Sequence, residues 1–251
     1  FRSYLSDYQD VNLLFGASAY SYLFSGNAPS ATARNVGEGQ WVESHNSALI
    51  IDGKDNAEIY HKSKLVVGVE MTPYPAFFCK IDNLLGGVMG RCIGQDEVSL
   101  LHCVASDSTG HITKSVPLGC AICYESVYPE HCAEYARAGA EALVVITNDA
   151  WWGDTPGYRQ HLRYSSLRAI ETRRDIARSA NTGISAFINQ RGDIVSHTAW
   201  WEPAVLTGSV NLNDSETFFV RQGDIIGRMC AFFSILLLLG VVVRAGITRQ
   251  E

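Results

Sequence analysis

The sequence predicts an α/β domain over residues 1–220, followed by one transmembrane helix over residues 225–243 and a short cytoplasmic tail over residues 244–251. Two observations support this prediction. Short apolar runs bounded by turn residues alternate with segments of helical spacing up to about residue 220. A run of fifteen uncharged residues, Met229–Val243, then lies close to the end of the chain.

Composition sets limits on size and partners. The chain has 251 residues, and this length is enough for one large domain or two small ones. Of these residues, 47% are hydrophobic and 18% are charged. The net charge is −6, and the basic residues form no long run. Nucleic acid is therefore not expected as a partner, because such binding depends on clustered positive charge.

The first half of the chain predicts mostly strands. A short helix is expected around Arg2–Tyr8, and an apolar strand follows over residues 11–20. Residues 46–52 predict a second strand, which a turn around Gly53 connects to a third strand before residue 65. Residues 72–108 have weak periodicity, so we expect long loops with one or two short elements there.

The second half alternates strand and helix more regularly. A strand that ends at Cys123 is followed by a helix that stops at Gly139, and a buried strand then leads into Asn148 and Asp149. The strongest helical pattern covers residues 158–180. Residues 183–197 predict two strands joined by a turn at 191–193. Chemistry in α/β domains gathers where strands end, so Cys123 and Asn148–Asp149 are candidate site positions.

The apolar run near the end of the chain has two interpretations. Fifteen residues cover about 22 Å of helix, which is short of a hydrocarbon core of about 30 Å and suits a buried core helix. Starting at Ile225 gives nineteen residues with Arg228 as the only charge, and a terminal arginine can reach the interface. We therefore expect a transmembrane helix. Arg244 and Arg249 then place the C-terminus in the cytoplasm and the domain outside.

The cysteines favour neither a metal site nor a complete disulfide framework. Seven are present, so at least one is unpaired. Cys120 and Cys123 form a C-x2-C pair, but no second pair or histidine pair follows with zinc-site spacing, so no metal is expected. Because side chains alternate along a strand, Cys120 and Cys123 point to opposite faces.

Cys123 is either a buried small hydrophobe or a nucleophile at a strand end. A thiol attacks a carbonyl only as the thiolate, so it needs a base and a cation or N–H groups for the oxyanion. Lys62 is a candidate cation, because Glu70 follows eight residues later and nearby opposite charge keeps an ammonium charged. The alternative for Lys62 is a solvated strand-edge lysine.

Five motifs together resemble the carbon–nitrogen hydrolase (nitrilase) superfamily, and within it the apolipoprotein N-acyltransferases of bacterial inner membranes. In chain order they are YHKSKLVVGVE, CAICYE, VVITNDAWWG, RQHLRYSSLRAIETRR and SANTGISAFINQRGD. The resemblance implies a four-layer α-β-β-α sandwich with a Glu–Lys–Cys triad. It also implies that residues 1–220 are a carbon–nitrogen hydrolase domain.

The resemblance assigns expected roles to individual residues. Cys123 matches the nucleophile, and Lys62 matches the lysine that stabilises the oxyanion. Glu70 and Glu125 match carboxylates that position Lys62 and the nucleophile loop. Tyr124 and Trp151 match aromatic residues that line the substrate cleft. No cofactor is implied.

Two departures from the family pattern lead to further expectations. The family commonly has Leu-Val-Pro-Phe-Gly-Glu where this chain has residues 65–70, so the loop that holds Glu70 is expected to differ. The family's general-base glutamate precedes the first matched strand, and the first glutamate here, Glu38, comes after it. We therefore expect an N-terminally truncated domain that lacks this base and is inactive by itself.

The resemblance implies transfer of an acyl chain from a phospholipid to the amine of an N-terminal diacylglyceryl-cysteine in lipoproteins, through a thioester on Cys123. The expected location is the bacterial inner membrane, with the domain on the periplasmic side. Two alternatives remain open. One is a nitrilase- or amidase-type hydrolase of small C–N substrates, and the other is an inactive, membrane-tethered binding domain.

Overall fold

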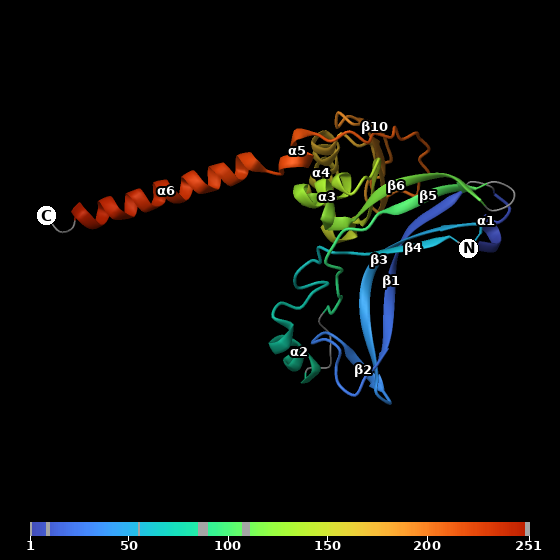
Figure 1. Ribbon diagram of the computed structural model, residues 1–251, viewed down its shortest axis with the longest axis horizontal. Coiled ribbons are helices and arrows are strands. Elements are labelled where there is room, and N and C mark those ends of the chain that lie inside the picture. Colours follow the sequence, from blue (N-terminus) through green and yellow to red (C-terminus); the bar gives the residue numbers. More distant parts are fainter. Residues whose placement is uncertain (1, 9–10, 55, 85–89, 107–110, 249–251) are drawn as a thin grey trace.

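Two β-sheets face each other, and helices cover the outer face of one of them (Figure 1). The computed structural model describes residues 2–8, 11–54, 56–84, 90–106 and 111–248. The smaller sheet is antiparallel, with β3 paired to its three other strands. Its strands are β1 (Asn12–Phe24), β2 (Arg34–Gly37), β3 (Gln40–Asp52) and β4 (Ala57–His61).

The larger sheet has six strands in the order β10-β9-β8-β7-β6-β5, and only its centre is parallel. The parallel strands β6, β7 and β8 end at one edge, where Ile122 pairs with Ile146 and Asn148 pairs with Asn181. This confirms that Cys123 and Asp149 each follow a strand end. The strands are β5 (Leu101–Ser106), β6 (Ile112–Ile122), β7 (Ala142–Asn148), β8 (Ile176–Asn181), β9 (Ala186–Ile188) and β10 (Ile194–His197).

Helices α3 (Pro129–Arg137) and α4 (Gly157–Thr172) pack on the larger sheet. The prediction of one helix over residues 158–180 is correct up to Thr172 and wrong over residues 173–180. Arg173 adopts a left-handed conformation with φ of 53°, which ends α4, and β8 begins at Ile176. Ile176 fits the apolar spacing of a helix and that of a strand equally well. Its pairing with Leu143 of β7 and Ile188 of β9 makes it part of a strand.

The first half of the chain differs from the prediction mainly in strand length. Strands β1 and β3 pair over thirteen residues each and form a long antiparallel ribbon, with β2 near its far end (Figure 1). Strand β2 was not predicted, because all its residues are exposed and give no apolar pattern. The other short elements are α1 (Arg2–Leu5) and α2 (Pro75–Leu84).

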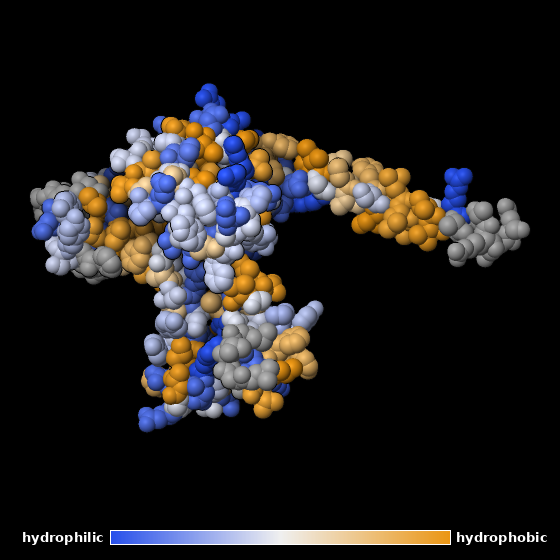
Figure 2. Space-filling view, turned by 180° about the vertical axis from the view of Figure 1, so that it is seen from behind, coloured by the Kyte–Doolittle hydropathy of each residue, from blue (hydrophilic) through white to orange (hydrophobic). Residues whose placement is uncertain are grey.

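The last helix, α6 (Ile225–Thr248), extends away from the domain after the short helix α5 (Phe218–Gln222) (Figure 1). Its segment Ile225–Arg244 is long and apolar enough to cross a membrane, and none of it is buried. Figure 2 shows apolar side chains along this helix. Within the described residues, α6 is therefore not a buried core helix, and an α/β fold with a C-terminal apolar helix is confirmed.

The packing of β6 against α3 leaves no space beside Gly119. A Cβ at this position would lie 2.6 Å from Tyr135 Cβ and 2.7 Å from Leu143 Cδ2. We expect Gly119→Ala to destabilise the domain by about 1–3 kcal/mol through overpacking. Thermal unfolding followed by near-UV circular dichroism measures this. The control is Gly26→Ala, where a Cβ meets no atom within 4 Å, so a midpoint equally lowered in both variants would contradict the packing argument.

The exposure of α6 generates a second prediction. Because its apolar side chains find no partner in the domain, we expect the chain to stay in the membrane pellet after alkaline carbonate extraction. Deletion of residues 225–251 should move the domain to the supernatant. Release of the intact chain by carbonate would show that α6 does not anchor it.

Candidate active site

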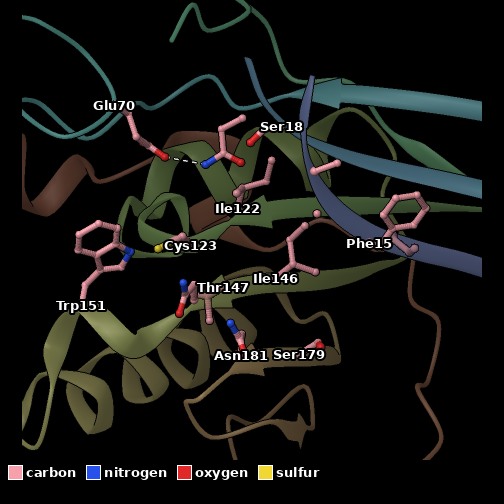
Figure 3. Close-up of a pocket in the computed structure, with 15 residues that line it drawn as sticks. Phe15, Ser18, Glu70, Ile122, Cys123, Ile146, Thr147, Trp151, Ser179 and Asn181 are labelled. Atoms are coloured by element: carbon pink, nitrogen blue, oxygen red, sulfur yellow. Dashed lines mark hydrogen bonds between the residues drawn. The ribbon is translucent and has the colours of Figure 1, made fainter. Parts of the chain in front are cut away.

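A pocket of about 550 Å³ lies between the two sheets, at the ends of the parallel strands. It is lined by residues of β1 and β3 from one sheet and by the ends of β6, β7 and β8 from the other. Figure 3 shows Cys123, Glu70 and Trp151 around one side of this pocket, with Ser179 and Asn181 on another. Of the predicted site residues, Cys123, Glu70 and Trp151 line the pocket, and so does Asn148 at the end of β7.

Cys123 follows β6 directly and begins the 3₁₀ turn η1 (Cys123–Val127). Its φ is 54°, in the left-handed region, which costs a residue with a Cβ roughly 1–2 kcal/mol. Such a conformation persists where the surrounding structure holds it, and it is common at functional sites. The turn leaves the thiol among the residues that line the pocket (Figure 3).

Lys62 lies immediately after β4 and is fully buried with its charge paired. Its Nζ donates to both carboxylate oxygens of Glu70, at 2.9 and 2.7 Å. The Asn46 amide on β3 donates to Glu70 Oε1 at 2.6 Å, which fixes the carboxylate from a second direction (Figure 3). The solvated-lysine interpretation is therefore wrong, since the ammonium has no exposure and one defined partner.

The loop that holds Glu70 closes without the Pro-Phe pair of the family pattern. Gly68 takes a φ of 86°, and the Val66 N–H donates to Glu70 Oε2 at 2.8 Å. The Glu70 N–H in turn donates to the Val66 carbonyl at 2.9 Å. The sequence differs, but these two hydrogen bonds bring the Glu70 carboxylate to Lys62.

Glu125 joins the two sheets. It is fully buried in η1, and its Oε2 accepts the Ile122 N–H of β6 at 2.8 Å. Its Oε1 accepts the backbone N–H groups of Ser63 and Lys64, at 2.8 and 3.0 Å. The segments that follow Lys62 and precede Cys123 are therefore bound to one carboxylate.

The Glu125 carboxylate is held in its ionised form. Burial alone would raise its pKa, but the hydrogen bond and charge of His131, with backbone donors, outweigh burial and lower that pKa. Tyr60 on β4 donates its hydroxyl to Glu125 Oε1 at 2.7 Å. Burial and then the charge of Glu125 raise the pKa of Tyr60, so the phenol keeps its proton and remains a donor.

The two cysteines of the C-x2-C pair have different environments. Cys120 is fully buried, and burial followed by the charge of Glu125 raises the pKa of its thiol. Burial also raises the pKa of Cys132, to about 12. All seven cysteines are unpaired in the structure, so none of the disulfides that the sequence allows is formed. Cys123 is the cysteine among the pocket residues.

The two predicted aromatic cleft residues lie in different places. Trp151, in the turn η2 (Asp149–Trp152), is 76% exposed and lines the pocket (Figure 3). Tyr124 packs edge-on against Tyr128, with ring centroids 5.9 Å apart, and is not among the pocket's lining residues. The 3₁₀ turn after Cys123 accounts for this, because it carries Tyr124 away from the strand direction. Its contact with substrate stays a prediction.

Sequence reasoning missed two residues beside the predicted ones. Asn46 gave no signal beyond being a polar residue in an apolar strand. His161, on α4, has its Nε2 3.1 Å from the Cys123 carbonyl oxygen, although it is 38 residues away in sequence. In the described part of the chain, no group of three or more His, Cys, Asp or Glu side chains could hold a metal ion.

The sequence is similar to that of bacterial N-acyltransferases. The apolipoprotein N-acyltransferase of Chlorobaculum tepidum is 33% identical over 201 residues, which cover 79% of this chain and 37% of that protein. That of Bdellovibrio bacteriovorus is 32% identical over 257 residues, which cover 96% of this chain and 44% of that protein. The chain thus spans less than half the length of these curated relatives.

The fold is similar to that of a solved amidase. A mutant of the amidase from Nesterenkonia sp. AN1, of the nitrilase superfamily, superposes with a TM-score of 0.52 at 16% identity. The match covers 90% of this chain and 70% of that one. A family model described as carbon-nitrogen hydrolase matches residues 22–218. Because this match covers most of the two-sheet domain and includes the Cys123 turn, the chain belongs to the carbon–nitrogen hydrolase family.

Proposed function

We propose that this protein transfers an acyl chain from a phospholipid to the N-terminal amine of a diacylglyceryl-cysteine in lipoproteins. One combination of observations supports this best. A pocket-lining thiol, Cys123, and a buried Lys62–Glu70 pair occur on a chain that also has an apolar helix with no partner in the domain. Relatives named apolipoprotein N-acyltransferase support the same reaction.

In the first half-reaction, the Cys123 thiolate attacks the ester carbonyl of the phospholipid. The carbonyl oxygen becomes an oxyanion, for which the Lys62 ammonium supplies positive charge from a buried position. The ester C–O bond then breaks, the lysophospholipid leaves as an alcohol that carries the proton given up by the Cys123 thiol, and the acyl chain remains as a thioester on Cys123.

In the second half-reaction, the lipoprotein amine attacks the thioester carbonyl. A second oxyanion forms and collapses, the C–S bond breaks, and the proton that the amine loses restores the Cys123 thiol as the amide forms. Glu70 orients Lys62 through both steps. Three donors already engage its carboxylate, from Lys62, Asn46 and Val66, which suits an orienting group better than a proton acceptor.

The apolar helix fits substrates that are confined to a bilayer. A domain held at the membrane surface can take both lipids without moving their tails into water, which would cost about 0.8 kcal/mol for each CH₂ exposed. We propose that residues 1–220 form the catalytic domain and that residues 225–243 cross the inner membrane. Arg244 in the segment 244–251 favours a cytoplasmic C-terminus and a periplasmic domain.

The thioester gives the sharpest test. In the full-length protein supplied with phospholipid and no amine acceptor, we expect mass spectrometry to find one acyl group on the peptide that contains Cys123. Cys123→Ala should abolish this adduct, because no other pocket residue is a thiol. Cys103→Ala, a half-buried cysteine on β5, serves as the control and should keep it. Hydrolysis of small amides without any lipid adduct would instead favour the amidase alternative.

Lys62 gives an independent prediction for the same reaction. Lys62→Met keeps the length of the side chain and removes the charge, so we expect the rate of acyl transfer to fall on the order of a hundredfold or more. Steady-state kinetics in detergent would measure kcat and KM. Lys114→Met, at an exposed position on β6, should stay within about twofold of the parent rate. Full activity of Lys62→Met would exclude the proposed oxyanion role.

A further inference from the structure

A buried polar cluster is in contact with the backbone of the Cys123 turn. It consists of His161, Asp149, Arg178 and Ser126, which we call the His161 cluster. All four are at most 3% exposed, and none lines the pocket that Cys123 faces. They come from α4, η2, β8 and η1, so the cluster connects four elements at one point.

Two members of the cluster meet at the Cys123 carbonyl oxygen. The Ser126 hydroxyl donates to this oxygen at 2.9 Å, and His161 Nε2 lies 3.1 Å from it. The other ring nitrogen, Nδ1, lies 2.8 Å from Asp149 Oδ1. Nδ1 also lies 3.2 Å from Arg178 Nη2, and Nε2 lies 3.1 Å from the Ser126 hydroxyl oxygen. Because a carbonyl oxygen only accepts, the contact with Cys123 requires an Nε2–H that donates to it.

Asp149 keeps the imidazole ring in place. Its Oδ2 accepts from Arg178 at 2.7 Å, and its Oδ1 accepts from the Thr147 hydroxyl at 3.1 Å. Burial alone would raise the pKa of Asp149, but the hydrogen bond from His161 and the charge of Arg178 outweigh it and lower that pKa. An ionised, fully bonded carboxylate thus fixes the orientation of His161.

We propose that His161 is the positioning residue for the nucleophile: held by Asp149, it fixes the Cys123 carbonyl and with it the left-handed backbone that directs the thiol into the pocket. This inference rests on the proposed function, in which Cys123 is the nucleophile. The peptide group is planar and trans, so a fixed Cys123 carbonyl also fixes the opposite direction of the Tyr124 N–H.

A purely structural role for His161 would depend on the volume of its ring and on nothing else. Three substitutions separate volume from hydrogen bonding. His161→Gln places an amide near the position of Nε2, where it can donate to the Cys123 carbonyl. His161→Met has similar length and no donor. His161→Asn is too short for the carbonyl but can still reach Asp149, and it replaces His161→Met in the comparison if that variant does not fold.

The experiment measures the rate at which iodoacetamide alkylates Cys123 in the full-length protein in detergent, by peptide mass spectrometry. Cys103 in the same digest is the internal control. We expect His161→Met and His161→Asn to slow alkylation of Cys123 about tenfold or more, with Cys103 unchanged and both variants still folded at the assay temperature. We expect His161→Gln to stay within about threefold of the parent rate.

Two results would overturn the proposal. One is alkylation of Cys123 at the parent rate in a folded His161→Met or His161→Asn protein. The other is an equal loss in His161→Gln and His161→Met, which would indicate a role in packing alone. The alkylation needs no lipid, so it is independent of the acyl-transfer assay. A parent protein that is alkylated normally but forms no acyl adduct would count against the proposed function only.

Discussion

The buried carboxylate of Glu125 is the interaction on which the arrangement of the site depends. It has no exposure to solvent, so every lone pair that it directs inward has to find a donor within the protein. The donors come from both sheets: the Ile122 N–H from β6, and the Ser63 and Lys64 N–H groups together with the Tyr60 hydroxyl from the β4 side. One ionised group therefore fixes the segment that holds Lys62 relative to the turn that holds Cys123.

Near Glu125, the strands of the larger sheet end, and the short turns that follow them hold residues of the site. The parallel strands β6, β7 and β8 end at one edge, and the turns after β6 and β7 present Cys123 and Trp151 at the pocket. The two thiols of the C-x2-C pair differ in location, since Cys123 lines the pocket and Cys120 is fully buried. Burial and then the charge of Glu125 raise the pKa of the Cys120 thiol. Glu70, a charged residue that lines the pocket, is already paired with Lys62, so little reorganisation of this pair is needed when charge develops on a substrate.

Much of this could be predicted from the sequence, because local patterns control it. The strand that leads into Cys123, the strand before Asp149 and the apolar helix from Ile225 each follow from residue spacing over a short window. The end of α4 could not be predicted, because Ile176 suits a helix or a strand until β7 and β9 pair with it. Strand β2 is exposed throughout and owes its conformation to pairing with β3 alone.

The sequence by itself determined the chemical groups: a thiol after a strand, a lysine eight residues before a glutamate, and a long apolar segment. These are local facts, and a resemblance to a family can attach roles to them. Only the tertiary structure decided which groups meet. Asn46 reaches Glu70 across 24 residues of chain, and His161 reaches the Cys123 carbonyl across 38. The physical reason is that a hydrogen bond needs two atoms within about 3 Å, and sheet pairing and helix packing, which depend on the whole chain, set that distance.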